Sequence, residues 1–241
     1  MIHAKNISFS YPDGNQALNK VSIDIKTGST VAVVGANGAG KSTLLSLLIG
    51  IHTAKEGEIQ IAGISMEKKN LEEIRKKVGF VFQNPDDQLF MARVYDDITF
   101  GPRNFGYSTE EITKMADKAI ETMKIEHLKD RAPHKLSGGE KRNVAIAAVL
   151  AMNPEVLLFD EPNSYLDPKN RRNFIHAMSE LQHTKLIATH DLDMVLDLCQ
   201  RVIILRKGEV FADGDPMELF RDMELMEQSG LEIPLSLQNR G

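Results

Sequence analysis

The chain has 241 residues, 42% hydrophobic and 26% charged, with a formal net charge of −5, so we expect one large globular domain or two small lobes. Its acidic balance argues against a protein that coats nucleic acid, and its single cysteine, Cys199, excludes a disulfide framework and a cysteine-based metal site. No apolar run approaches the ~20 residues of a membrane span, and the N-terminus lacks the layout of a signal peptide, so we expect a cytosolic protein.

The first eighty residues are predicted to form strands around one helix. Alternating apolar and polar residues at 2–11 and 21–25 predict antiparallel strands on either side of the turn "PDGN". The apolar run "TVAVV", 30–34, is typical of a strand buried on both faces, and it leads through a glycine-rich loop into a helix ending near Gly50. "GEIQIAG" and "VGFVFQ" predict two further strands.

From about residue 87 the pattern becomes helical. The stretch 109–125 has apolar residues three and four apart, and Ser108 or Thr109 can cap it. After it we expect helices at 138–152, 168–182 and 191–199, and strands at 155–160, 185–190, 201–205 and 208–214. This alternation predicts an α/β fold with a largely parallel sheet, an antiparallel β subdomain at its start and a helical lobe inserted at about 87–152.

The stretch "GANGAGKS" fits the phosphate-loop pattern G-x-x-x-x-G-K-[ST], between a predicted strand and a predicted helix. Glycines let backbone N–H groups turn toward an anion, and the helix N-terminus adds partial positive charge. Lys41 can bridge the β- and γ-phosphates of a nucleotide, and the Ser42 hydroxyl can bind Mg²⁺. A plain glycine-rich turn with an exposed lysine is the disfavoured alternative. The candidate binding residues of this loop are Gly35, Ala36, Asn37, Gly38, Ala39, Gly40, Lys41, Ser42 and Thr43.

Two adjacent carboxylates follow the predicted buried strand "VLLF". Ligands of such sheets lie at the carboxyl ends of the strands, so Asp160 can hold Mg²⁺ and Glu161 can orient or deprotonate an attacking water. A solvated acidic strand end would be an equal alternative if the chain had no phosphate loop.

Two more polar residues, His190 and Gln83, end predicted strands. His190 can donate a hydrogen bond to a γ-phosphate, and a structural histidine is an equally good interpretation. The Gln83 amide can contact the metal or the water, although the residue alone favours an ordinary polar loop position.

Taken together, Tyr11, the phosphate loop, Gln83, "LSGGE", "LLFDEP", "LDP" and His190 resemble the ATPase subunit of an ABC transporter. The resemblance covers the chain to about residue 220 and implies a P-loop NTPase core, an ABC ATPase domain at 1–220 and a short helical tail at 221–241. It implies ATP and Mg²⁺ as cofactors and Tyr11 stacked on adenine. A Tyr11 buried in the first sheet is the alternative.

The resemblance also gives a role to "LSGGE", which carries no catalytic group. In this family two ATPase subunits pair head to tail, so Ser137, Gly138, Gly139 and Glu140 of one subunit would face the nucleotide of the other. The partner is then a second ATPase subunit, the same chain or a homologous one. Asp167 would lie at that interface, or would simply cap the helix that begins at Pro168.

A narrower resemblance links residues 78–106, "VAIAAVLAMNPEVLLFDEP" and "GDPMELF" to the ATPases of energy-coupling-factor importers of cobalt, nickel or vitamins. It implies that residues 84–106 receive a membrane-embedded partner on the cytoplasmic face of the membrane. Leu89, Phe90 and Met91 can grip a partner helix or fill the lobe's own core. Another class of ABC transporter is the main alternative; a soluble ABC ATPase of DNA repair or translation, or a small-molecule kinase, lacks support.

Three positions depart from the family pattern. Glu140 replaces the usual glutamine, and its carboxylate can still accept a ribose hydroxyl. Asn143 stands where arginine is common, with Arg142 beside it as a candidate substitute. Tyr165 is bulky for a dimer interface. These departures bear on turnover and on the choice of partner rather than on ATP binding.

Overall fold

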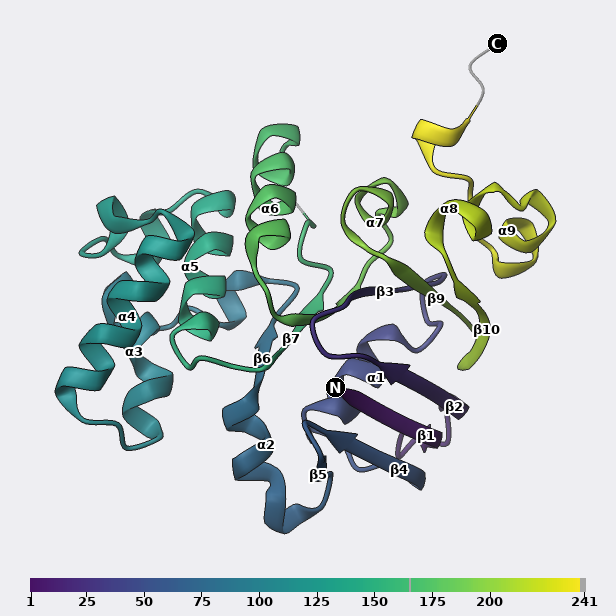
Figure 1. Ribbon diagram of the computed structural model, residues 1–241, viewed down its shortest axis with the longest axis horizontal. Helices are drawn as coiled ribbons and strands as arrows, with labels where there is room; N and C mark the ends of the chain where they lie inside the picture. The colour runs from purple at the N-terminus through teal and green to yellow at the C-terminus, as the bar shows by residue number, and fades with distance from the viewer. Residues whose placement is uncertain (165, 239–241) are drawn as a thin grey trace. The chain divides into compact units, whose positions relative to one another are not determined.

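The computed structural model describes residues 1–164 and 166–238 (Figure 1). The chain divides into two compact units. Unit 1 comprises residues 1–75 together with the segment from residue 182 onward, and unit 2 comprises residues 76–181.

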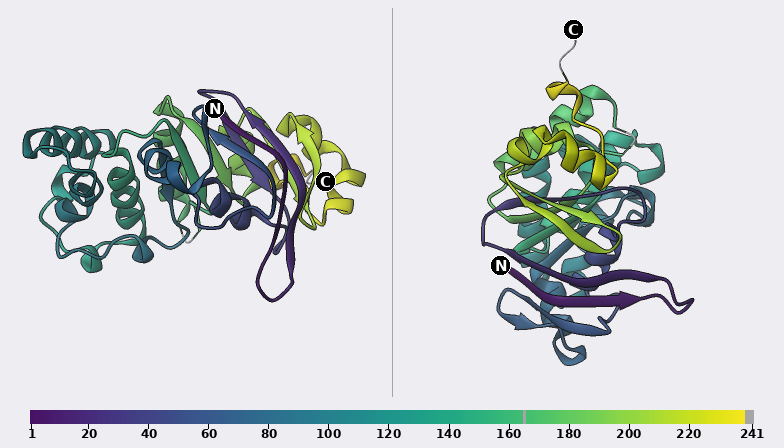
Figure 2. Two further views of the ribbon diagram at one scale, coloured as in Figure 1. Left: turned by 90° about the horizontal axis from the view of Figure 1, so that it is seen from below. Right: turned by 90° about the vertical axis from the view of Figure 1, so that its right-hand side faces the viewer.

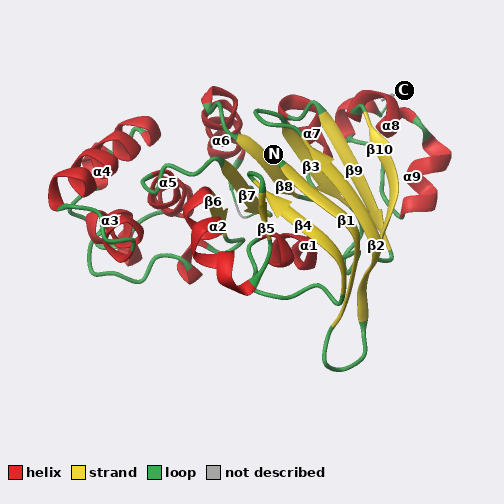
Figure 3. Ribbon diagram, turned by 60° about the horizontal axis from the view of Figure 1, so that its bottom comes forward, coloured by secondary structure: helices red, strands yellow, loops and turns green. Residues whose placement is uncertain are grey.

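Unit 1 contains an antiparallel sheet in the order β2-β1-β4-β5 (Figure 3). Its strands are β1 (Ile2–Ser10), β2 (Gln16–Ile25), β4 (Glu56–Ile61) and β5 (Ile64–Ser65). Burial alternates along the second half of β2, because successive side chains point to opposite faces of a strand. Strands β1 and β2 pair antiparallel, with Ile2 opposite Ile25, so the predicted hairpin is confirmed.

The second sheet of unit 1 is mostly parallel and has the order β10-β9-β3-β8. Its strands are β3 (Thr30–Val34), β8 (Thr184–Ala188), β9 (Arg201–Arg206) and β10 (Glu209–Gly214). Every residue of β3 is buried, as the continuous apolar run 30–34 predicted, and every residue of β8 is buried as well. Strand β3 pairs in parallel with both β8 and β9, which places the carboxyl ends of the three strands at one edge.

Helices cover this sheet, and the C-terminal segment adds to the cover. The helices of unit 1 are α1 (Lys41–Leu48), α7 (Leu192–Leu198), α8 (Pro216–Arg221) and α9 (Met223–Ser229), with α2 (Leu71–Lys77) at the boundary. Val34, Ile204 and Phe220 belong to one core cluster, which α7, α8 and α9 share with β3 and β9. The C-terminal helices, coloured yellow, lie beside the yellow-green strand in Figure 2. The amides of Leu235 and Ser236 donate to the Asp193 carboxylate at 3.2 and 3.1 Å, so the tail is fastened to α7.

Unit 2 combines a parallel pair of strands with helices. The strands are β6 (Val78–Val81) and β7 (Val156–Asp160), and the helices are α3 (Val94–Asn104), α4 (Thr109–Met123), α5 (Gly138–Leu150) and α6 (Pro168–Glu180). Short 3₁₀ turns lie at Lys68–Asn70, Pro85–Asp87, Glu126–Leu128, Pro133–Lys135 and Leu235–Leu237 in the two units. Val81 pairs with Phe159, so β6 and β7 end together.

Three local features differ from the sequence prediction. Strand β6 ends at Val81 rather than residue 83, and the first α-helix of the helical region begins at Val94 rather than near residue 87. Helix α2 was not predicted. Only one of its residues, Ile74, is buried, so its sequence carries a weak amphipathic pattern.

The cap of α4 is Ser108, one of the two predicted residues. Its hydroxyl accepts from the Glu111 amide, and the Glu111 carboxylate accepts from the Ser108 amide.

Candidate functional site

The glycine-rich loop of unit 1 joins β3 to α1 and has no room for a side chain at Gly35 or Gly40. Gly40 has φ +105°, and a Cβ there would lie 2.7 Å from the Ala17 carbonyl oxygen. Gly38 has φ +79° and open space around it. As the N-cap of α1, Gly40 supplies no side-chain acceptor to the first turn, so the helix start is suited to an external anion.

Lys41 begins α1 and is only 8% exposed. Its Nζ donates to the Gly35 carbonyl at 2.7 Å and to the Ala36 carbonyl at 3.4 Å. The ammonium is thus held inside the loop by the loop's own backbone. Ser42 is exposed beside it, while Thr43 is buried.

Tyr11 lies beside the same helix. Its hydroxyl and the Thr43 hydroxyl form a hydrogen bond of 2.9 Å. Its ring meets Phe9 and His52 edge-on, at centroid distances of 5.1 and 5.7 Å, and the residue is half-buried. The half-buried Tyr11 ring is therefore held next to the phosphate-loop helix, and nothing in the sequence pointed to its contact with His52.

His190 follows β8 at the edge of the sheet where β3 ends. Val33 pairs with Ala188, and the Thr189 amide donates to the Val33 carbonyl at 3.1 Å. The parallel register thus carries His190 to the edge where the phosphate loop begins, and the residue is exposed there.

In unit 2, Gln83, Asp160 and Glu161 lie at the matching ends of β6 and β7. Val81 pairs with Phe159, so the next residues of both strands leave the sheet at the same edge. Glu161 is 9% exposed and has φ +44°, a left-handed backbone that is uncommon for a residue with a side chain. Such local strain is often found at functional positions.

Ser137 and Glu140 form a capping box at the start of α5. The Ser137 hydroxyl accepts from the Glu140 amide at 3.3 Å, and Glu140 Oε2 accepts from the Ser137 amide and hydroxyl at 2.8 Å each. These bonds lower the pKa of Glu140. The carboxylate at this position therefore serves its own helix, while Ser137 and Gly138 stay exposed.

The third signature residue, Gly139, faces a neighbouring helix. A Cβ at Gly139 would lie 2.6 Å from the side chain of Asn170, which donates to the Asp167 carboxylate at 2.8 Å. Asp167 also accepts from the Asn170 amide, so it is the N-cap of α6, as one interpretation held. Tyr165, the bulky residue of this loop, lies outside the described residues.

The segment 84–106 presents aromatic rings and covers a buried acid. Phe90 is 62% exposed and packs edge-on against Phe100 at 4.9 Å, whereas Leu89 is buried. The Asp97 carboxylate accepts from the amides of Phe90 and Met91 at 3.0 and 3.1 Å, and burial raises its pKa. Leu89 thus belongs to the core of the unit, and Phe90 belongs to the surface.

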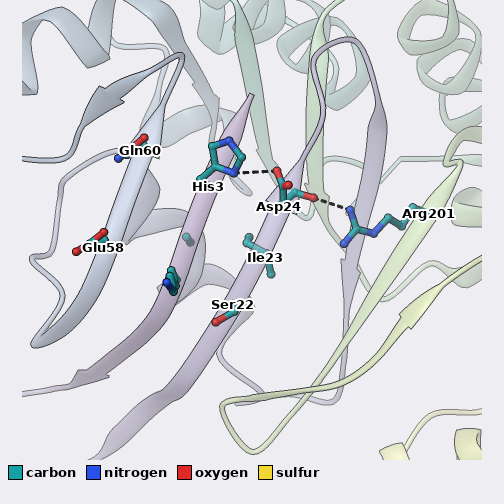
Figure 4. A pocket seen from close by; sticks show the side chains of 9 residues that line it. His3, Ser22, Ile23, Asp24, Glu58, Gln60 and Arg201 are labelled. Carbon is teal, nitrogen blue, oxygen red and sulfur yellow. Dashed lines mark hydrogen bonds and ion pairs between the residues drawn. The ribbon is translucent and has the colours of Figure 1, made fainter.

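A polar pocket in unit 1 lies apart from the phosphate loop (Figure 4). His3 pairs with Asp24 at 2.9 Å, and Arg201 donates to the Asp24 carbonyl and, through two nitrogens, to the Asp213 carboxylate. These bonds join β2 to β9 and β10, so the charges of this pocket serve to connect the two sheets of unit 1.

The model of the protein family described as "ABC transporter" matches residues 18–164 of this chain. The chain belongs to the ABC transporter family. It is 44% identical to the energy-coupling factor transporter ATP-binding protein EcfA of Methanothermobacter thermautotrophicus, over 97% of this chain and 77% of that protein. Both levels of the resemblance are therefore confirmed, and the chain is an ABC-type ATP hydrolase.

Solved structures agree with this assignment. The cbiO1 protein of Clostridium perfringens, part of the ABC transporter complex cbiONQ, superposes with a TM-score of 0.85 at 39% identity, covering 94% of this chain and 93% of that one. The MJ0796 cassette, a dimer bound to ADP and Pi in a post-hydrolysis state, has a TM-score of 0.80 at 31% identity, covering 90% and 99%. The ABC ATPase fold expected from the sequence is confirmed. None of the described helices has the length and apolar character to cross a membrane.

Proposed function

We propose that this chain is the ATPase subunit of an energy-coupling-factor importer and lies on the cytoplasmic face of the membrane. Its similarity to the relative named EcfA and to cbiO1 supports this importer class over other ABC transporters. The observation that carries the proposal is the start of α1, where Gly40 leaves the first turn without a side-chain cap and so suits it to a phosphate.

Each candidate residue has a role in this proposal. Lys41 and the amides of residues 35–43 bind the ATP phosphates, and Tyr11 stacks on adenine. Glu161 orients and deprotonates the attacking water, and His190 donates to the γ-phosphate. The exposed position of His190 and the burial of Glu161 are compatible with these roles.

The residues proposed to hold Mg²⁺ each carry an oxygen atom, the kind of ligand that this ion prefers. Ser42, Gln83 and Asp160 supply a hydroxyl, an amide oxygen and a carboxylate, and Asp160 is half-buried at the end of β7. A bound Mg²⁺ would neutralise phosphate charge during hydrolysis.

The signature residues act on a partner's nucleotide. Ser137, Gly138, Gly139 and Glu140 of one subunit would face the ATP of a second ATPase subunit, because their own loop carries no base or metal ligand. Segment 84–106 would receive the membrane-embedded subunit, with the exposed Phe90–Phe100 pair as its apolar contact. No nucleic acid is involved.

Complementation between two inactive variants tests the head-to-tail arrangement. Lys41→Ala removes the lysine of the phosphate loop, and Ser137→Arg blocks the signature turn. A mixed dimer of the two has one site with both defects and one site with none. We expect each variant alone to be inactive, and the equimolar mixture to recover about a quarter of the parental rate under random pairing and independent sites.

The control is a doubly substituted chain, Lys41→Ala with Ser137→Arg, mixed with the parent protein. Every dimer that contains the doubly substituted chain lacks an intact composite site. If the two single variants stay inactive when mixed, although light scattering shows that they pair, the trans role of the signature residues is wrong.

A further inference from the structure

The loop that carries Gln83 is fastened to the helix that carries the signature turn. Three residues of α5 make this connection, namely Lys141, Arg142 and Ala145. The Lys141 ammonium pairs with Asp86 at 2.6 Å, and the Ala145 carbonyl accepts from the Gln88 side chain at 2.7 Å. Residues 141 and 145 lie one turn apart, so they share a face of α5.

Arg142 makes the central connection. One terminal nitrogen of its guanidinium donates to the Phe82 carbonyl and the other to the Gln83 carbonyl, each at 2.5 Å. Carbonyls of successive residues point to opposite sides of an extended strand, so both can reach one guanidinium only where the chain turns. Arg142 therefore fixes the turn that ends β6 at Val81.

The arginine is costly to place there. It is 1% exposed, and among the described residues its partners are backbone carbonyls rather than a carboxylate. Its Nε is also buried without a hydrogen-bond partner in that part of the chain. Burial lowers the pKa of Arg142 to about 10, which still leaves the side chain charged at pH 7. A buried cation with these partners indicates a specific structural demand at this position.

We infer that Arg142 is a positioning residue that holds the Gln83 loop to the signature helix, so that Gln83 and Ser137 move as one piece. The inference rests on the roles proposed above for Gln83 and the signature turn. It also accounts for the departure at residue 143, because the neighbouring Arg142 is the arginine that turns inward.

Hydrogen exchange directly tests the clamp, meaning the contacts of Arg142 with the carbonyls of Phe82 and Gln83. The amides of Asp87, Gln88 and Leu89 are bonded within the loop, at 3.0 to 3.1 Å, and therefore exchange slowly while the loop keeps its shape. We expect Arg142→Met to speed exchange across residues 82–89 by about tenfold or more, with α4 unchanged. Unchanged exchange in 82–89 would overturn the inference. Arg142→Lys, which keeps the charge but cannot span both carbonyls, replaces Arg142→Met if that variant does not fold.

A double-mutant cycle in kcat tests the consequence for turnover. Arg142→Met should lower kcat about tenfold or more and change KM for ATP by less than about threefold, since a displaced group affects the chemical step first. In a Gln83→Ala background the same substitution should change kcat by less than about twofold, because the two residues act as one unit. Lys141→Met, which removes the neighbouring and more exposed contact, should have a much smaller effect.

The outcomes separate the inference from the proposed function. A full loss in both backgrounds would show that Arg142 acts independently of Gln83 and would contradict the inference. A Gln83→Ala protein that hydrolyses ATP at the parental rate would contradict the proposed role of Gln83, and hydrogen exchange would then decide on the clamp alone.

Discussion

Units 1 and 2 present their candidate residues by different physical means. In unit 1 a glycine loop follows a fully buried strand, and its shape is set by backbone angles and by close contacts such as that of Gly40 with Ala17. In unit 2 the signature turn is held by a side-chain capping box, and the Gln83 loop by a buried arginine. The arrangement in unit 1 should therefore fail when a side chain is added, whereas the arrangement in unit 2 should fail when one is removed.

The largest effect is expected from Lys41→Ala in unit 1. Loss of the buried Lys41 ammonium, which we propose contacts the ATP phosphates, should weaken ATP binding by about 10- to 100-fold, as for hydrogen bonds to charged groups. Calorimetric titration with Mg-ATP measures this. Lys129→Ala removes an exposed lysine of unit 2 and should leave the affinity unchanged; an equal loss in that variant would contradict a specific role for Lys41.

The next effect contrasts one substitution at two glycines. Gly40→Ala adds a Cβ against the Ala17 carbonyl at a φ of +105° and should lower the free energy of unfolding by about 1–3 kcal/mol. Gly138→Ala meets nothing within 4 Å in a helix and should leave stability unchanged or raise it by up to about 1 kcal/mol.

Thermal denaturation compares the two variants, and ATPase assays sharpen the contrast. Gly138→Ala should lose turnover despite its stability, because the added methyl obstructs the approach of a partner's phosphate. A Gly138→Ala protein that is as active as the parent would count against the signature turn as a phosphate contact.

A smaller effect separates the two capping boxes of unit 2. Ser108→Ala and Ser137→Ala each remove an N-cap and should each cost about 1 kcal/mol of stability. Only Ser137→Ala should also reduce kcat, since Ser108 lies on α4, outside the signature turn. Equal activity of the two variants would mean that Ser137 is only a cap.

The smallest effect concerns the pH dependence of unit 2. Burial raises the pKa of Asp97, so the folded state binds its proton more tightly than the unfolded state. This residue therefore contributes stability below the unfolded pKa of about 3.9 that is lost as pH rises through the higher folded value. Asp97→Asn keeps an acceptor for the two loop amides and removes the charge.

Urea denaturation of both proteins at pH 4 and pH 7 measures this dependence. The stability of Asp97→Asn relative to the parent should be higher at pH 7 than at pH 4. A difference that stays constant, or that falls with rising pH, would contradict a raised Asp97 pKa.

The sequence predicted those parts of the molecule whose signals are local. The run 30–34, the glycine loop and the capping residues of α4 each depend on neighbours in the chain, and the structure confirms the elements that they form. The Ser137–Glu140 capping box has the same spacing as Ser108–Glu111, and that spacing was the signal that could have found it.

Other features depend on contacts between distant segments and left no such signal. "EKRN" reads as a polar helix start, and nothing in it shows that Arg142 turns inward to residues 82 and 83 while Lys141 stays near the surface. The positive φ of Glu161 could not be predicted either, because a residue other than glycine gives no sequence signal for a left-handed backbone.

We propose that ATP closes a head-to-tail dimer of this chain. Light scattering coupled to size-exclusion chromatography of the Glu161→Gln protein, with and without Mg-ATP, tests it most directly, since the variant should bind ATP without hydrolysing it. We predict a monomer without nucleotide and a stable dimer with Mg-ATP. A protein that binds Mg-ATP and remains monomeric would contradict the claim and would point to a different obligatory ATPase partner.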